Sequence, residues 1–172
     1  VYPNGLPITV NPADTGWILT LDGRDVAFFD ALLAEQSKNL CIDGKRVFSY
    51  GHSFGAYMSN VLGCRRAKVV RAIAAFAGGP PSGTCDGPMA AWIAHAKDDT
   101  VVLVSEGNAT RDKWGGTNGC DLAKSAPVTP APCVAFQGCG ASTPLHWCNP
   151  TLGNHNWPGF AAQGIWQFFA DR

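Results

Sequence analysis

The run GHSFG at residues 51–55 places a serine midway between two glycines, which is the spacing of a nucleophile on a sharp turn. Residues 46–50 before it favour a short β-strand, and residues 56–64 after it favour a helix without proline. We expect a side chain in place of either glycine to collide with the adjoining strand or helix. Such a turn would expose the Ser53 hydroxyl at a helix N-terminus, where negative charge that develops during a reaction is favoured.

A serine hydroxyl becomes a useful nucleophile only when a base takes its proton and an acid orients that base. In folds that carry such a turn, the order along the chain is serine, then the acid, then the histidine. Among four histidines we favour His155 as the base, because it lies in a predicted loop, GNHNWPG, ahead of the last helix. We expect His52 to point away from the serine and to be structural. His95 and His146 are expected to be satisfied core or surface imidazoles.

Two adjacent carboxylates compete for the place of the acid. Asp98 and Asp99 directly follow the predicted strand 90–95, so they lie at the carboxyl edge of a parallel sheet, where folds of this class gather their sites. Spacing alone leaves the choice between them open. The other carboxylates precede the serine or lie in predicted helices and loops, where a solvated side chain is expected: Asp14, Asp22, Asp30, Glu35, Asp43 and Asp121.

The elements that must position these groups alternate between strands and helices. The sequence therefore predicts one domain, residues 1–172, with a mostly parallel α/β sheet and flanking helices. Two runs in it are almost continuously apolar, which is typical of parallel strands covered on both faces. The predicted strands are 46–50, 71–77, 90–95 and 132–137, and the predicted helices are 24–36, 56–64 and 158–170, the last with Pro158 at its start.

Charge and hydropathy exclude several classes of partner. The 13 basic and 13 acidic side chains cancel and form no block of like charge, so we expect no nucleic-acid partner. No apolar run approaches the roughly 20 residues of a membrane-spanning helix, so we expect a soluble chain with no membrane partner. The chain begins without a charged and then apolar leader, so we expect any export signal to have been removed.

Seven cysteines are present, with no Cys-x-x-Cys pair and no histidine at zinc-ligand spacing beside them. We therefore expect disulfides, an oxidising compartment and no metal site, with at least one thiol unpaired. Cys41 precedes the serine strand and Cys64 ends the following helix, so a Cys41–Cys64 bridge at the non-catalytic end is geometrically reasonable. The pairing stays open for Cys120, Cys133, Cys139 and Cys148.

Several segments carry a resemblance to a known family. The run HAKDDTVV resembles the His-Gly-x-x-Asp-x-x-Val segment of extracellular polyhydroxybutyrate depolymerases and of the related feruloyl and acetylxylan esterases of carbohydrate esterase family 1, which makes Asp99 the acid. GNHNWPG matches the family's Gly-x-His-x-Trp-Pro-Gly segment, with His155 in the catalytic place. The segments CIDGKRVFSYGHSFGAYMSNVLGC, YPNGLP, GW and DVAFFDALL extend the resemblance over nearly the whole chain.

The resemblance implies an α/β-hydrolase fold that is N-terminally truncated, because YPNGLP corresponds to a mid-sheet strand in the family. Ala96 replaces the family's glycine after His95, which is a small change. The family's first oxyanion donor comes from an N-terminal His-Gly loop without a counterpart here, so the resemblance assigns only the backbone N–H of Phe54 to the oxyanion. This departure implies that a missing N-terminal segment or a second chain completes the protein. That segment or chain could contain the cysteine that pairs with the odd thiol.

We therefore expect a secreted serine ester hydrolase that works through an acyl-enzyme and needs no metal or organic cofactor. The resemblance implies feruloyl-type esters of the plant cell wall, short-chain hydroxyalkanoate polyesters or synthetic aromatic polyesters as substrates. Trp157 could stack on an aromatic acyl group, although core packing is an equal alternative for it and for Trp17 and Trp147. The rival class is a non-catalytic or degenerate hydrolase-fold module that binds polysaccharide, which the absent oxyanion loop favours.

Overall fold

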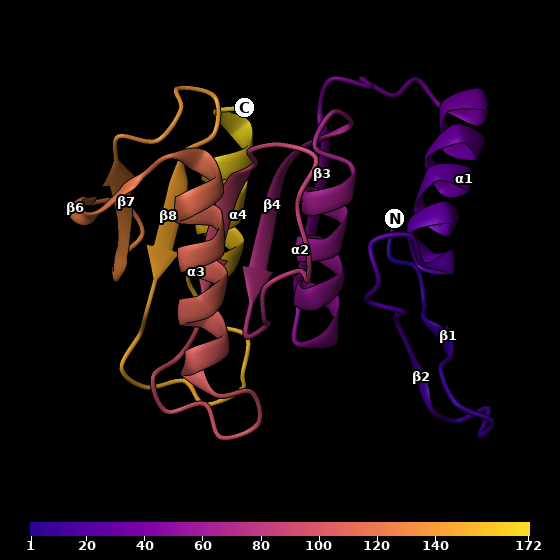
Figure 1. Ribbon diagram of the computed structural model, residues 1–172, viewed down its shortest axis with the longest axis horizontal. Coiled ribbons are helices and arrows are strands. Elements are labelled where there is room, and N and C mark those ends of the chain that lie inside the picture. Colours follow the sequence, from indigo (N-terminus) through magenta and orange to yellow (C-terminus); the bar gives the residue numbers. More distant parts are fainter.

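A six-stranded sheet forms the centre of the computed structural model, which describes residues 1–172 (Figure 1). In spatial order its strands are β3 (Val47–His52), β4 (Val70–Phe76), β5 (Ala90–Ala94), β8 (Leu145–Cys148), β7 (Cys133–Gln137) and β6 (Asp121–Pro127). The first four strands are parallel, and β7 runs antiparallel to both of its neighbours. The predicted α/β class and mostly parallel sheet are thus confirmed.

Helices cover both faces of this sheet (Figure 1). Two helices, α2 (Phe54–Arg65) and α3 (Val104–Asn118), lie on one face, while α4 (Ala161–Ala170) lies on the other. Side chains of β4 alternate between the two layers, since Ile73 packs with the α2 side and Phe76 packs with the α4 side. Because both faces are covered, the strand reads as a continuous apolar run rather than an alternating one.

The first 23 residues and the first helix lie outside the sheet (Figure 1). β1 (Leu6–Pro7) pairs with β2 (Thr15–Gly16) in a separate two-stranded hairpin, and α1 (Arg24–Asn39) follows it. The YPNGLP segment therefore does not pair with the sheet here, and β3 forms the sheet edge. The buried Asp25 carboxylate accepts a hydrogen bond from the N–H of Ile18 at 2.6 Å, which connects the hairpin segment to α1.

Among the helices and the strands of the six-stranded sheet, three elements were not predicted, namely α3, β6 and β8. Helix α4 begins at Ala161, three residues beyond the predicted Pro158, whose carbonyl accepts the N–H of Ala161 at 2.9 Å in a preceding turn. None of the helices combines the length and the apolar character that a bilayer crossing requires.

Three disulfides cross-link the chain, Cys64–Cys85, Cys120–Cys139 and Cys133–Cys148, and Cys41 is free and exposed. The expected Cys41–Cys64 bridge is wrong. The segment between β4 and β5 passes the end of α2, where the N–H of Asp86 donates to the Cys64 carbonyl at 2.9 Å, and this brings Cys85 to Cys64. Because the strand and the helix that follows it have similar lengths, Cys41 and Cys64 lie at the same end of the sheet. These lengths do not determine the lateral distance between the two cysteines.

Candidate active site

Ser53 occupies the turn between β3 and α2 with φ 54° and ψ −121°, a backbone conformation that residues with a side chain rarely adopt. A Cβ at Gly51 would collide with the backbone of Gly55, so a glycine is required at this close approach. A Cβ at Gly55 would meet nothing within 4 Å, so the expected collision there is wrong. The strained turn directs Ser53 to the carboxyl end of the parallel strands, and the following Phe54 N–H belongs to the first turn of α2, which lacks intrahelical partners.

Asp99 and His155 meet in this region, with Asp99 Oδ2 2.8 Å from His155 Nδ1. The Asp99 side chain is fully buried, and its other oxygen, Oδ1, accepts the N–H groups of Val101 and Val102 at 2.9 and 3.0 Å. Burial acts to raise the pKa of Asp99, but the hydrogen bond from His155 and the two backbone N–H groups outweigh it and lower that pKa. Asp99 is therefore ionised at neutral pH and favours a proton on the facing ring nitrogen.

The adjacent carboxylate, Asp98, has a different set of contacts. Its Oδ1 accepts the N–H of Asn154 at 2.7 Å, and its Oδ2 accepts the N–H of Gly153 at 3.2 Å. Asp98 therefore contacts the backbone of the loop that carries His155, while Asp99 contacts the imidazole. Of the two competing aspartates, the geometry brings Asp99 and not Asp98 to the histidine ring.

His95, expected to be a satisfied core or surface imidazole, is a second imidazole beside Asp99. Its side chain is fully buried, and its Nε2 lies 2.8 Å from the Val102 carbonyl and 3.4 Å from Asp99 Oδ2. Because a carbonyl can only accept, this nitrogen carries the proton. The sequence did contain a signal, since His95 and Asp99 both fall within the HAKDD run.

His52 lies against His155, which the sequence did not indicate. The two ring centroids are 4.7 Å apart, and the ring of Phe76 stacks on His52 at 5.2 Å. Burial and, next, the charge of His155 lower the pKa of His52, while a contact with the His155 backbone and the charge of Asp99 act in the opposite direction. His52 is therefore a neutral ring that packs on the candidate base.

No hydrogen bond joins the candidate base, His155, to the Ser53 hydroxyl in this structure. The Ser53 hydroxyl makes no hydrogen bond, and the backbone N–H of Ser53 donates to the Phe76 carbonyl at 2.9 Å. The structure thus joins Asp99 to His155 and brings the residue next to Ser53, His52, against the same ring. Catalytic hydrogen bonds to a serine are often long without a ligand and tighten when substrate binds.

An exposed aromatic strip, formed by Tyr2, Tyr50 and Trp157, adjoins this site. Trp157 is 39% exposed, and its ring lies 6.0 Å from that of His52 and 6.4 Å from that of Tyr50. Tyr50 in turn meets Tyr2 edge to face at 6.1 Å. By contrast, Trp147 is buried and Trp17 packs partly buried against the core. Of the three tryptophans weighed, Trp157 contacts His52 and Trp17 lines a cavity with Tyr2 and Tyr50, and the two tyrosines were not predicted.

His146, the remaining histidine, lies away from this site, against the Phe168 ring of α4 at 4.7 Å. Burial, reinforced by the Arg172 charge, lowers the pKa of His146 to about 4, so it is a neutral core residue. No group of three or more His, Cys, Asp or Glu side chains is arranged to hold a metal ion.

Comparison with curated proteins finds fungal relatives over most of this chain. It is 37% identical to Feruloyl esterase D of Neurospora crassa over 185 residues, which cover 99% of this chain and 60% of that protein. It is 33% identical to Feruloyl esterase C of Emericella nidulans over 181 residues, which cover 98% of this chain and 63% of that protein. The chain thus spans about 60% of the length of these relatives. No family model matches.

Solved structures with the same fold are also esterases. The acetyl xylan esterase from Aspergillus awamori superposes with a TM-score of 0.74 at 16% identity, covering 92% of this chain and 74% of that chain. Esterase PE8 superposes with a TM-score of 0.69 at 16% identity, covering 98% of this chain and 76% of that chain. These similarities establish the α/β-hydrolase fold.

Proposed function

Because the chain is a homologue of fungal feruloyl esterases and has the α/β-hydrolase fold, we propose that it is a serine carboxylic ester hydrolase. Ser53 is the nucleophile, His155 the general base and Asp99 the acid that orients it. The observation that carries this proposal is the 2.8 Å contact between Asp99 Oδ2 and His155 Nδ1 beside the strained serine turn.

In the first half of the reaction the Ser53 Oγ attacks the ester carbonyl, and its proton passes to His155 Nε2. Asp99 accepts the hydrogen bond from His155 Nδ1–H, which leaves Nε2 free to take that proton and stabilises the imidazolium formed. The oxyanion of the tetrahedral intermediate faces the N–H of Phe54 and the N-terminus of α2. Collapse of the intermediate breaks the ester C–O bond, and the proton on Nε2 leaves with the alcohol.

In the second half, water attacks the acyl-Ser53 ester and gives its proton to His155 Nε2. The second tetrahedral intermediate breaks the acyl–Oγ bond, and the proton returns to Ser53 as the carboxylic acid departs. Asp99 stays ionised throughout, which agrees with its lowered pKa.

We propose feruloyl-type esters as the substrate class. The aromatic strip of Tyr2, Tyr50 and Trp157 lies beside His52 and His155 and offers exposed ring faces and edges to a planar aromatic acyl group. The names of the fungal relatives point to the same class. The three disulfides support an extracellular location, because such bonds persist in oxidising compartments.

The test is hydrolysis of methyl ferulate by the purified chain, with Ser53→Ala as the inactive variant and Ser37→Ala, on the exposed surface of α1, as the matched control. We expect turnover in the native chain and in the control, and loss of turnover in Ser53→Ala. An oligomeric hydroxybutyrate ester in parallel distinguishes the two substrate classes. A native chain that is folded and hydrolyses neither ester would favour the non-catalytic module.

A further inference from the structure

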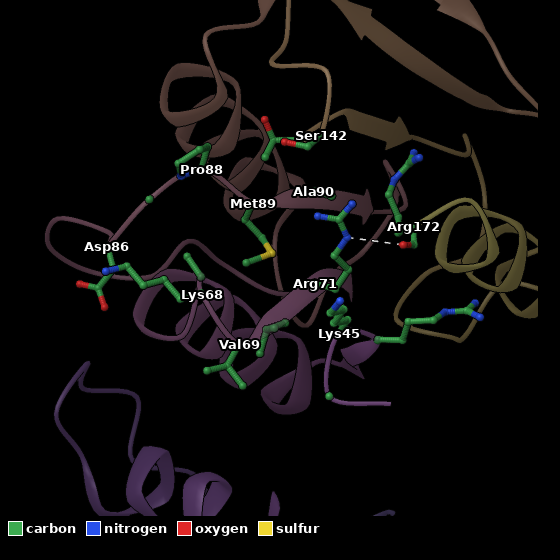
Figure 2. A pocket seen from close by; sticks show the side chains of 16 residues that line it. Lys45, Lys68, Val69, Arg71, Asp86, Pro88, Met89, Ala90, Ser142 and Arg172 are labelled. Atoms are coloured by element: carbon green, nitrogen blue, oxygen red, sulfur yellow. Dashed lines mark hydrogen bonds between the residues drawn. The ribbon is translucent and has the colours of Figure 1, made fainter. Parts of the chain in front are cut away.

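A basic cavity lies at the end of the sheet opposite the candidate active site. It has a volume of about 730 Å³ and opens among the segments that precede four parallel strands (Figure 2). Those segments are 44–46 before β3, 67–71 at the start of β4, 86–90 before β5 and 142–143 before β8, joined by Arg172.

Unpaired cations gather in this cavity. Six of the 13 lysine and arginine side chains form ion pairs with carboxylates elsewhere on the chain, and seven do not. Five of those seven line this one cavity: Lys45, Arg46, Lys68, Arg71 and Arg172. In a chain whose net charge is zero, this is a marked local excess of positive charge.

No side-chain carboxylate forms an ion pair with the five cations of the cavity. Asp86 is the one acidic side chain in the lining, and it is engaged by Arg65 at 2.9 Å. Arg71 Nε reaches only a main-chain oxygen of Arg172 at 3.5 Å, and Arg172 Nε is buried without a hydrogen-bond partner (Figure 2). Burial lowers the pKa of Arg172, the charge of Asp171 acts against this, and the smaller effect of the Arg71 charge lowers that pKa further. The guanidinium groups of Arg71 and Arg172 carry charges of the same sign, so an anion between them would be favoured.

We propose that this basic cavity binds the carboxylate groups of an acidic polysaccharide. No aromatic side chain lines the cavity, so it offers no platform on which nucleic-acid bases could stack. The ammonium and guanidinium groups are accompanied by the hydroxyls of Ser142 and Thr143, which suits the carboxylate and hydroxyl groups of a uronate sugar. The choice of a polysaccharide among polyanions rests on the proposed function.

The cavity and the candidate active site are separated by the length of the sheet. β4 alone has seven residues, which span about 23 Å at about 3.3 Å per residue. A small ester therefore reaches Ser53 without touching the cavity, whereas a polymer anchored in the cavity raises the local concentration of its own esters. Binding of polyuronate and hydrolysis of a small ester can accordingly be measured separately.

The experiment measures binding of polygalacturonate by isothermal titration calorimetry at low ionic strength, with neutral arabinoxylan as the comparison polymer. The test variant is Lys68→Gln with Arg71→Gln, and Lys45→Gln with Lys68→Gln replaces it if the first fails to fold. The matched control, Lys38→Gln with Lys124→Gln, removes two exposed charges outside the cavity. We expect polygalacturonate to bind the native chain and the control, and to bind the test variant at least about tenfold more weakly.

Absence of polygalacturonate binding, or an equal loss in the control, would overturn the inference. Tighter binding of polyuridylate than of polygalacturonate would also overturn it, because the occupant would then be a nucleic acid. Methyl ferulate hydrolysis is followed on the same preparations. A native chain that hydrolyses the ester but does not bind polyuronate refutes only the cavity, and a chain that binds without hydrolysing supports the cavity and refutes the proposed function.

Discussion

Replacement of Asp99 by asparagine isolates the orienting role of this carboxylate, because its two oxygens serve different partners. Oδ1 accepts the N–H groups of Val101 and Val102 at 2.9 and 3.0 Å, and Oδ2 faces His155 Nδ1 at 2.8 Å. An asparagine keeps its Oδ1 toward the two N–H groups, since the reverse orientation would lose both hydrogen bonds. Its Nδ2–H then donates to His155 Nδ1 and places the imidazole proton on Nε2, the nitrogen that must accept the proton of Ser53.

We therefore expect Asp99→Asn to lower kcat for methyl ferulate by about 10⁴, the loss that the wrong histidine tautomer causes in a serine triad. This corresponds to about 5.4 kcal/mol of barrier. Folding should change much less, because the two backbone hydrogen bonds to Oδ1 are kept. Steady-state kinetics and thermal unfolding of the same preparation measure the two effects.

Asp98→Asn is the matched control. Its Oδ1 still accepts the N–H of Asn154, and only the longer contact with Gly153 is lost, so we expect activity within about tenfold of the native value. Near-normal activity in Asp99→Asn, or an equal fall in both variants, would refute the assignment of Asp99 as the acid.

Three further predictions follow from the site and its scaffold. The kcat/KM for a neutral ester should rise with pH in a single step, because the general base must be neutral to accept the serine proton and burial lowers the pKa of the neighbouring His52; two resolved steps would contradict this. Replacing Cys64 and Cys85 together by serine should cost about 3 kcal/mol of unfolding free energy in urea titrations, since the bond closes a 21-residue separation, whereas replacing the free cysteine should have little effect. Trp157→Ala should raise KM for methyl ferulate more than KM for an acetate ester, and an equal change in both would argue against aromatic stacking.

Most of the sheet could be predicted because β4 and β5 carry apolar side chains on both faces. Helix α3 could not be predicted, since it contains Gly107, Gly115 and Gly116 and no continuous apolar stripe. Its position depends on tertiary contacts instead, including the indole N–H of Trp114, which donates to the buried Asn60 side chain at 2.9 Å. Strand β8 has four residues, too few to show a period.

The residue types of the candidate site could be predicted, but several of its contacts could not. The order of serine, aspartate and histidine follows from the topology of a parallel sheet, which brings the carboxyl ends of its strands to one edge. Which of two adjacent aspartates faces the imidazole depends on the turn that follows β5, and sequence spacing contains no information on that turn. The packing of His52 on His155 likewise depends on the backbone angles of Ser53, which reverse the chain between β3 and α2.

Asp98 and Asp99 contact different parts of the loop that carries His155, namely its backbone and the imidazole ring. Asp98 accepts the backbone N–H groups of Gly153 and Asn154, and the Asn154 side chain in turn accepts the hydroxyl of Thr100 at 3.3 Å. Asn154 has φ 49°, a conformation that is retained only when surrounding contacts compensate its cost. The loop after β8 is therefore held by the loop after β5 on its backbone, while Asp99 from the same loop holds the ring. The position of the general base thus depends on several contacts between these two loops, in which Asp99 contacts the ring and Asp98 contributes hydrogen bonds to the loop backbone.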